Sequence, residues 1–315
     1  MAPLTRLRHH LTHRRLNPPL GFIHIPKAAG TAIIQRIETN LRPRRSIYRL
    51  DQTQFGGFTN FASITPTLRA GIILNPDAIP ANADLIAGHL SPNSIRTRHP
   101  GAHLVTILRA PALRLLSHWF YWRGYTNEVL ALYGDWGSNI ATARADLADF
   151  LANKQLACVT DNIMLRMLLW PHPLIPSDDF INPTDDAALL AATLSTLADF
   201  AFTIIIEAPR AREQLDQFLA TTYGVSLWTH LHHRLKGPDP IKANRSKIPV
   251  VKMRTPLATQ LTTTAGPLLE QRTRLDDRLW QSIASRHLTR PAMEHLYHAA
   301  LRCSVQRYDA LDQQL

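Results

Sequence analysis

Short runs of apolar residues alternate along this chain with stretches that have helical spacing. The runs are rich in β-branched residues and carry few charges, which is typical of strands buried on both faces of a sheet. We predict strands at residues 21–25, 46–50, 84–89, 103–109 and 201–207. Strands that alternate with helices indicate an α/β fold, in which a central parallel β-sheet is flanked by helices.

Apolar residues at helical spacing also predict the intervening helices. One helix begins at Thr31 and another at Ala112, directly after a proline that suits a first turn. A third opens on Asp161, a residue type that often caps helix N-termini. From Thr255 to the end of the chain the pattern is mostly helical.

The organisation that we expect is a single α/β domain over residues 20–315, preceded by a basic extension over residues 1–19. The chain has 315 residues, of which 45% are hydrophobic and 19% charged, as in proteins that form a core. No stretch approaches the roughly 20 apolar residues that a membrane span needs. Cys158 and Cys303 are the only cysteines. Because two cysteines give no disulfide framework, we expect a cytoplasmic protein.

The positive charge is concentrated near the N-terminus. The formal net charge is +11, and residues 1–50 contain ten Lys or Arg against a single acidic residue, Glu38. Such a region would attract an anionic ligand. A solvated basic surface or a nucleic-acid-binding patch would have the same composition, so charge alone does not distinguish these classes.

The stretch GFIHIPKAAGTAIIQRI, from Gly21, leads from the first strand into the first helix. Ligands of parallel sheets bind beyond the carboxyl ends of strands, where a helix N-terminus offers unpaired N–H groups and a positive dipole end. Lys27 adds a charge, Thr31 adds a hydroxyl, and Gly30 allows the backbone to approach closely. The Walker pattern G-x-x-x-x-G-K-[ST] is absent, and no Ser or Thr follows Lys27 to hold magnesium. We therefore predict a P-loop-like anion site that needs no metal.

The segment HIPKAAGTA resembles the phosphosulfate loop of sulfotransferases, usually written Pro-Lys-Thr-Ala-Gly-Thr-Ser. These enzymes use 3′-phosphoadenosine 5′-phosphosulfate (PAPS), and the resemblance implies a P-loop-like three-layer sandwich. Ala28 and Ala32 stand where hydroxyl residues are common in the family, but backbone N–H groups could still bind the 5′-phosphate. The loop residues that the resemblance implies for PAPS binding are Lys27, Ala28, Ala29, Gly30, Thr31 and Ala32.

The segment VTILRAPALRLLSHWF supplies a second motif. Arg109 ends a buried strand and Ser117 lies in the following helix, so the two side chains can converge on one phosphate. The segment looks like the family's 3′-phosphate site, Leu-Arg-Asp-Pro followed by Leu-Leu-Ser-His-Tyr, with Ala110 in place of the acid. Because ATP has only a hydroxyl at its 3′ position, Arg109 would distinguish PAPS from ATP. We expect His118 to pack within its helix.

Transfer of a sulfuryl group to an alcohol needs a base near the acceptor and a positive charge near the leaving oxygen. Lys27 suits the leaving oxygen. His89 ends a predicted strand at the same sheet edge, and carbohydrate 2-O-sulfotransferases, which this region resembles, carry a Gly-His here with the His as base. Packing at a strand end is the other interpretation of His89. Asp51 and Glu207 are the alternative bases, and His24 is expected inside the first strand.

Two further segments are similar to parts of the family. DNIMLRMLL resembles a helix with the pattern Asn-x-x-x-Arg, which implies that Asn162 and Arg166 lie near the acceptor; a surface arginine on an apolar helix would look the same. KANRSKIP resembles a basic loop that closes over the nucleotide through residues such as Arg245, and a plain solvated loop is the alternative. The resemblance covers about residues 20–290.

The function that we expect is sulfuryl transfer from PAPS to a hydroxyl of a carbohydrate or similar acceptor, without a metal and without a nucleic-acid partner. A bacterial source would fit this expectation. One alternative is a P-loop-type nucleotide kinase, which would need a carboxylate at a strand end and magnesium. The other is a non-catalytic basic nucleic-acid-binding protein, whose binding to polynucleotides would weaken steeply with salt.

Overall fold

A six-stranded sheet forms the centre of the protein in the computed structural model, which describes residues 13–224 and 248–315. Every neighbouring pair of strands is parallel, and the order is β3-β2-β4-β1-β5-β6. The predicted α/β fold is confirmed, as are the five predicted strands; β3 is an additional short strand. The strands are β1 (Leu20–Ile23), β2 (Ser46–Asp51), β3 (Ile72–Ile73), β4 (Leu85–His89), β5 (His103–Leu108) and β6 (Phe202–Ile205).

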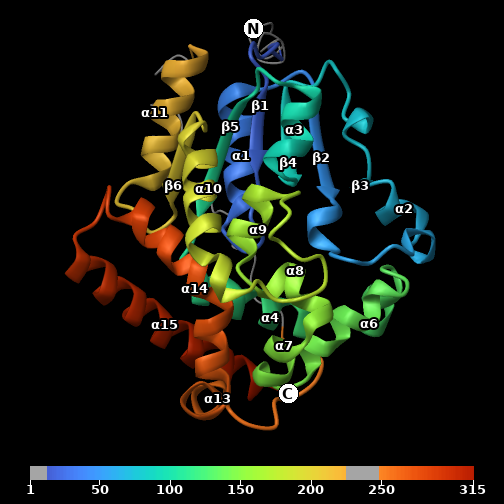
Figure 1. Ribbon diagram of the computed structural model, residues 1–315, viewed down its shortest axis with the longest axis vertical. Helices are drawn as coiled ribbons and strands as arrows, with labels where there is room; N and C mark the ends of the chain where they lie inside the picture. The colour runs from blue at the N-terminus through green and yellow to red at the C-terminus, as the bar shows by residue number, and fades with distance from the viewer. Residues whose placement is uncertain (1–12, 225–247) are drawn as a thin grey trace, which may run out of the picture.

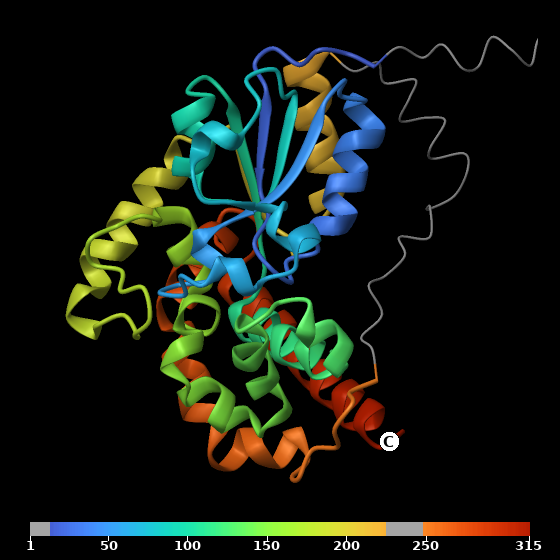
Figure 2. The same cartoon turned by 90° about the vertical axis from the view of Figure 1, so that its right-hand side faces the viewer.

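Helices cover both faces of the sheet, as the strand pattern predicts. Figure 2 shows α1 (Gly30–Leu41) and α11 (Ala211–Tyr223) on one face, and α3 (Pro92–Arg98) and α10 (Asp186–Ala198) on the other. All four residues of β1 are buried because it lies in the middle of this sandwich. The apolar side chains of both sheet faces join one large core. The result is the expected three-layer arrangement.

Most of the other helices gather beyond the carboxyl ends of the strands, in the lower half of Figure 1. The C-terminal region is helical, as predicted. The prediction that Asp161 caps a helix is wrong: Asn162, with φ of 49°, precedes the helix, and Asp161 pairs with Arg166 instead.

No helix of residues 13–224 and 248–315 is both long and apolar enough to cross a membrane. The remaining helices are α2 (Pro66–Arg69), α4 (Pro111–Arg123), α5 (Asn127–Ala131), α6 (Trp136–Ala141), α7 (Leu147–Ala152), α8 (Ala157–Thr160), α9 (Ile163–Leu169), α13 (Leu257–Thr263), α14 (Ala265–Ala284) and α15 (Arg290–Asp312).

The strand order changes direction at β1. The chain passes from β1 through α1 to β2 on one side, while β5 lies on the other side of β1. In open parallel sheets a crevice forms at such a point, beyond the carboxyl ends of the strands. The register aligns Ile23 at the end of β1 with Gly88 in β4 and Thr106 in β5. The loop after β1 is thereby brought beside the ends of both neighbours.

Two residues of the segment before β1 contact the rest of the chain. Arg14 pairs with Pro43 in an isolated β-bridge, and Leu16 is buried in the main core. The Asp84 carboxylate accepts hydrogen bonds from the backbone N–H groups of Leu16 (2.9 Å) and Arg45 (3.0 Å). Of the extension expected over residues 1–19, Arg14 and Leu16 thus contact the rest of the chain, and residues 1–12 lie outside the described part.

Replacing Asp84 by alanine should destabilise the protein. Asp84→Ala removes the acceptor of two N–H groups, and we expect the free energy of unfolding in urea to fall by about 2–4 kcal/mol. Asp77→Ala is the matched control because Asp77 is exposed, and its effect should stay within about 0.5 kcal/mol. Equal effects of the two substitutions would contradict the anchoring role of Asp84.

Candidate functional site

A cavity of about 560 Å³ opens at the carboxyl ends of the strands. Its walls come from the loop after β1, the ends of β2 and β4, α4, the region around α5 and α6, and the first turn of α11. A volume of this size is typical of sites for small ligands. Most of the residues that the sequence predicted for the site line this cavity: Lys27, Ala29, Gly30, Thr31, Ala32, His89, Arg109 and Ser117.

The charges around this cavity have one sign. Lys27, Arg109 and Arg212 line it, and none of its lining residues in the described part is an Asp or Glu. Arg212 was not predicted; it lies in the first turn of α11, directly beyond β6. Because all strands of a parallel sheet end at the same edge, a basic residue shortly after the predicted strand at 201–207 could have been assigned to the site from the sequence. The cavity is electrostatically suited to an anion.

The loop between β1 and α1 has an unusual backbone. Lys27 (φ 66°) and Ala29 (φ 62°) both adopt the left-handed conformation, which costs a non-glycine residue about 1–3 kcal/mol. Within the described ranges, no acceptor is hydrogen-bonded to the N–H groups of Ala29, Gly30 or Thr31. Successive free N–H groups in a left-handed turn form a concave binding site for anions. Ala28 is buried and does not line the cavity.

Gly30 is required by a neighbouring side chain. It is the first residue of α1, and a Cβ there would lie 1.8 Å from Cδ2 and 2.0 Å from Nε2 of His24. The expectation that Gly30 brings the backbone close to a ligand therefore has to be extended, because Gly30 also makes room for the His24 ring. His24 itself follows β1 and lines the cavity, which the strand pattern did not indicate.

The hydrogen bond made by His89 assigns a proton to its Nδ1. Its Nδ1 lies 2.5 Å from the carbonyl oxygen of His24, and because a carbonyl only accepts, Nδ1 carries the proton. Nε2 of the neutral ring is then an acceptor, and the ring lines the cavity. Burial is the largest effect on His89 and lowers its pKa, so the neutral form is favoured near pH 7.

Gly88 (φ 147°), directly before His89, allows β4 to pack closely against β2, since a Cβ at this position would lie 1.9 Å from the carbonyl oxygen of Arg49.

Lys27 and Arg109 are held together at the cavity. Arg109 Nη1 donates a hydrogen bond of 2.8 Å to the carbonyl oxygen of Lys27. Lys27 Nζ lies 3.9 Å from the centre of the Tyr121 ring. Burial, and then the charge of Arg109, lower the pKa of Lys27 to about 8. No carboxylate of the described residues forms an ion pair with either side chain, so both charges are available to a ligand.

The middle of α4 contributes two more groups. Ser117 lines the cavity, as predicted, and His118 lines it as well, although packing within the helix was expected. Nδ1 of His118 lies 3.4 Å from the Arg114 guanidinium. Burial and then Arg114 hold the pKa of His118 well below its usual value. His118 is therefore neutral at the cavity wall. Its ring packs edge-on against the Trp122 ring, with 4.3 Å between the ring centres.

Asp51 and Glu207, the two alternative bases, do not line the cavity. The Asp51 carboxylate is buried and accepts hydrogen bonds from groups of Thr53, Ser91 and Ser94. The Glu207 carboxylate accepts from the backbone of Ala110 and from the Trp280 indole, and burial raises its pKa. Both carboxylates hold structural elements together, so His89 is the better candidate for a base.

Asn162 and Arg166 were expected near the acceptor, and the structure places them elsewhere. Both are buried and neither lines the cavity. The Asn162 side chain accepts from the backbone N–H groups of Leu275 and Asp276, while Arg166 pairs with Asp161 at 2.9 Å and donates to backbone carbonyls. They connect α9 to α14 and to the loop after α9. The predicted residue Arg245 lies outside the described residues.

A second hollow, of about 850 Å³, lies between α14 and α15. Its walls carry charges of both signs, including an ion pair between Arg290 and Glu294. It has no equivalent of the loop after β1, whose N–H groups lack acceptors within the described residues, so the cavity at the sheet edge is the candidate site. Within residues 13–224 and 248–315, no three His, Cys, Asp or Glu side chains are grouped as a metal ion would require.

Substitution of Gly30 tests the packing between the loop and His24. Gly30→Ala should force the His24 ring to move, because overpacking of this kind costs about 1–3 kcal/mol. We expect a corresponding loss in the free energy of unfolding, measured in urea. At Gly101 a Cβ would meet nothing within 4 Å, so Gly101→Ala is the control and should change stability by less than about 0.5 kcal/mol. Equal stability of both variants and the parent protein would refute the assignment.

Comparison with known proteins adds no relative. No protein-family model matches the chain, and no curated protein matches it either. The function therefore has to be inferred from the residues of the cavity.

Proposed function

We propose that the protein is a sulfotransferase that moves the sulfuryl group of PAPS to a hydroxyl acceptor. The observation that carries the proposal is the cavity at the end of β1, where free backbone N–H groups and three cations face one space without a carboxylate. A phosphosulfate with a second phosphate elsewhere on the molecule has the charge distribution that such a cavity would accept. The segments HIPKAAGTA and LRAPALRLLSH, which resemble the family's two phosphate sites, supply most of these groups.

The proposed donor site divides between two elements. The N–H groups of residues 29–31 and the Lys27 ammonium would bind the 5′-phosphosulfate at the N-terminus of α1. Arg109 and Ser117 would bind the 3′-phosphate. Arg109 uses Nη1 to hold the Lys27 carbonyl, which leaves its other nitrogen atoms for the phosphate. Arg212 is exposed at the edge of the cavity and would add charge there.

The chemical step would use His89 and Lys27. His89 Nε2 takes the proton of the acceptor hydroxyl while the acceptor oxygen forms a bond to sulfur. The bond between sulfur and the phosphate oxygen breaks, and the Lys27 ammonium stabilises the negative charge that develops on that oxygen. The products are a sulfate ester and 3′-phosphoadenosine 5′-phosphate. Since the side chains provide both the base and the charge, the proposal invokes no metal.

The acceptor and the location are also proposals. The resemblance of the Gly88–His89 region to carbohydrate 2-O-sulfotransferases suggests a carbohydrate or another molecule with a hydroxyl. Cys158 and Cys303 are both free thiols, which fits the reducing cytoplasm. A nucleic acid is not part of the proposal, because Lys27, Arg109 and Arg212 gather around one cavity of about 560 Å³, the size of a small-ligand site.

Ligand-dependent thermal unfolding tests the donor. 3′-Phosphoadenosine 5′-phosphate at about a hundred times its dissociation constant should add about 2.7 kcal/mol and raise the melting temperature by several degrees without a metal. ADP should have a much smaller effect. A shift with ATP and magnesium alone would overturn the proposal in favour of a kinase.

The same assay tests Arg109. Arg109→Ala should weaken binding of 3′-phosphoadenosine 5′-phosphate at least tenfold, to about the affinity of the parent protein for ADP, because a lost charged hydrogen bond costs about 1.5–3 kcal/mol. Arg286 is exposed and does not line the cavity, so Arg286→Ala is the control and should bind normally. Unchanged affinity in Arg109→Ala would exclude Arg109 from the 3′-phosphate site.

The pH dependence of kcat/KM should be bell-shaped. Protonated His89 cannot accept a proton, so the rate should fall as the pH drops through its pKa, which lies below the usual 6.5. Neutral Lys27 cannot stabilise the leaving oxygen, so the rate should also fall as the pH rises through about 8. Lys27→Arg should move the alkaline limb upward by more than one pH unit, because a guanidinium stays charged. An alkaline limb that stays in place in Lys27→Arg would rule out Lys27 as its source.

A further inference from the structure

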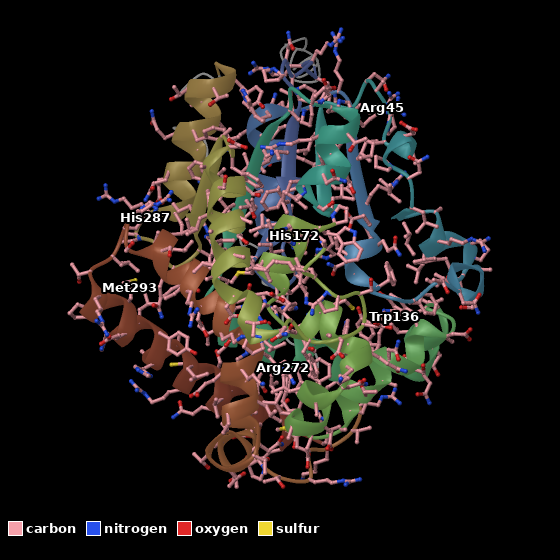
Figure 3. All side chains as sticks on the ribbon, viewed as in Figure 1. Arg45, Trp136, His172, Arg272, His287 and Met293 are labelled. Atoms are coloured by element: carbon pink, nitrogen blue, oxygen red, sulfur yellow. The ribbon has the colours of Figure 1, made fainter. Side chains whose placement is uncertain are left out.

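The cavity has a second part that the phosphate groups would not need. Besides Trp122, which packs against His118, five aromatic side chains line it from three regions of the chain: Phe55, Tyr121, Tyr125, Tyr133 and Trp136. Tyr121 packs edge-on against Tyr125, with 5.2 Å between the ring centres, and Tyr125 stacks with Tyr133, with 6.1 Å between the ring centres. The ring centres of Phe55 and Trp136 lie 5.6 Å apart. Figure 3 labels Trp136, which is the first residue of α6 and lies beside the segment after β2. We call these five side chains the aromatic wall.

The aromatic wall adjoins the groups proposed for the reaction. Lys27 Nζ lies over the Tyr121 ring, so the wall begins where the leaving oxygen would be. On the other side, Phe55 of the wall follows Leu50, the register partner of His89, by five residues, and all three line the cavity. An acceptor packed on the wall would share this cavity with His89 and Lys27.

The end of α4 fixes part of this wall. The guanidinium of Arg123 is fully buried and donates to the carbonyl oxygens of residues 143, 144 and 145 and of Val251. These bonds attach the last turn of α4, which carries Tyr121 and precedes Tyr125, to the neighbouring segments. The aromatic wall is thus a preformed surface, and a ligand would not have to order it.

The wall offers no partner for a charged acceptor. The three cations that line the cavity lie on the loop after β1, at the end of β5 and on α11, where the proposed donor would occupy them. None of the lining residues in the described part is acidic, so a protonated amine would find no carboxylate and only the weaker attraction of the aromatic rings. Burying an unpaired charge is strongly unfavourable.

The wall also has few partners for an acceptor with many hydroxyls. Besides the histidines and Lys27, the polar groups in this part are the Gln54 amide, the tyrosine hydroxyls and the indole N–H groups of Trp122 and Trp136. The Tyr125 hydroxyl already interacts with those of Tyr121 and Tyr133. A sugar ring carries hydroxyls on all sides, and those that face the aromatic rings would lose water without gaining hydrogen bonds, which selects against it.

We propose that the acceptor is an uncharged alcohol whose hydroxyl is carried on an apolar ring, held flat against the aromatic wall. This inference rests on the proposed function and narrows its acceptor away from carbohydrates. The hydroxyl gives its proton to His89 Nε2 and its oxygen forms the new bond to sulfur, as the bond from sulfur to the donor phosphate breaks. A phenol and a saturated ring alcohol share the required chemistry, and an aromatic ring gains additional stacking energy on the wall.

Binding experiments on the full chain test this inference without relying on turnover. Trp122 and Trp136 line the cavity, so their fluorescence should report a bound ring. The probes are 2-naphthol, decahydro-2-naphthol, methyl glucoside and glucuronic acid, each titrated with and without 3′-phosphoadenosine 5′-phosphate. We expect 2-naphthol to bind at least tenfold more tightly than either sugar. A sugar that binds as tightly as 2-naphthol, or no binding of either naphthol, would overturn the inference.

The comparison of the two naphthols identifies the kind of ring. They have the same carbon skeleton, so tighter binding of 2-naphthol assigns an aromatic acceptor, whereas equal binding of both assigns apolar ring alcohols in general. Transfer from PAPS should follow the same order of probes. If 3′-phosphoadenosine 5′-phosphate binds but sugars are sulfated faster than the naphthols, the acceptor inference fails and the proposed function stands. If that nucleotide does not bind at all, the proposed function fails, and the naphthol titrations still decide whether the wall binds apolar rings.

Variants of Tyr133 connect the binding to the wall. Tyr133→Ala should weaken 2-naphthol binding about three- to tenfold, as expected for loss of one aromatic contact, and should leave nucleotide binding unchanged. Tyr133→Phe keeps the ring and should bind like the parent protein. Tyr48 is exposed and lies outside the cavity, so Tyr48→Ala is the control. Normal 2-naphthol binding by Tyr133→Ala would contradict the proposed position of the ring.

Discussion

The loop after β1 is fixed on both sides by the strands that flank it, and the candidate site depends on this support. On the β4 side, the His24 N–H donates to the Gly88 carbonyl, and His89 Nδ1 donates to the His24 carbonyl. On the β5 side, the Thr106 hydroxyl donates to the Ile23 carbonyl, and Arg109 donates to the Lys27 carbonyl. Three of these four bonds are donated by a side chain, so they position the backbone and at the same time orient His89, Thr106 and Arg109.

This support explains how two left-handed residues persist without glycine. Lys27 and Ala29 adopt a conformation that is unfavourable for them, and the bonds to β4 and β5 offset the cost. The consequence is a set of N–H groups that point into one space before any ligand arrives. Stabilisation of an anion by such groups needs little rearrangement, which is the condition under which electrostatic catalysis is effective.

The sequence predicted the sheet and much of the cavity because both depend on short-range patterns. Buried parallel strands are continuous apolar runs, and Lys27, His89 and Arg109 were recognisable because each follows or ends such a run. The side chains that were missed depend on contacts between distant segments. Nothing in the strand pattern says that the His24 ring turns toward Gly30, or that His118 on an otherwise buried helix reaches the cavity. Asn162 and Arg166 were misplaced because a polar pair on an apolar helix can equally well bind a neighbouring helix, and α14 provides that partner.

The cations of the cavity come from positions 27, 109 and 212, which lie in different thirds of the chain. The supporting bonds have similarly long separations, since they link residues 23–27 to residues 88–109. Contacts between distant positions form slowly, after local helices and turns. The third cation therefore reaches the cavity only when β6 and α11 have joined the edge of the sheet. During synthesis, a chain that ends before residue 212 would hold the loop after β1 without the full set of charges that faces it.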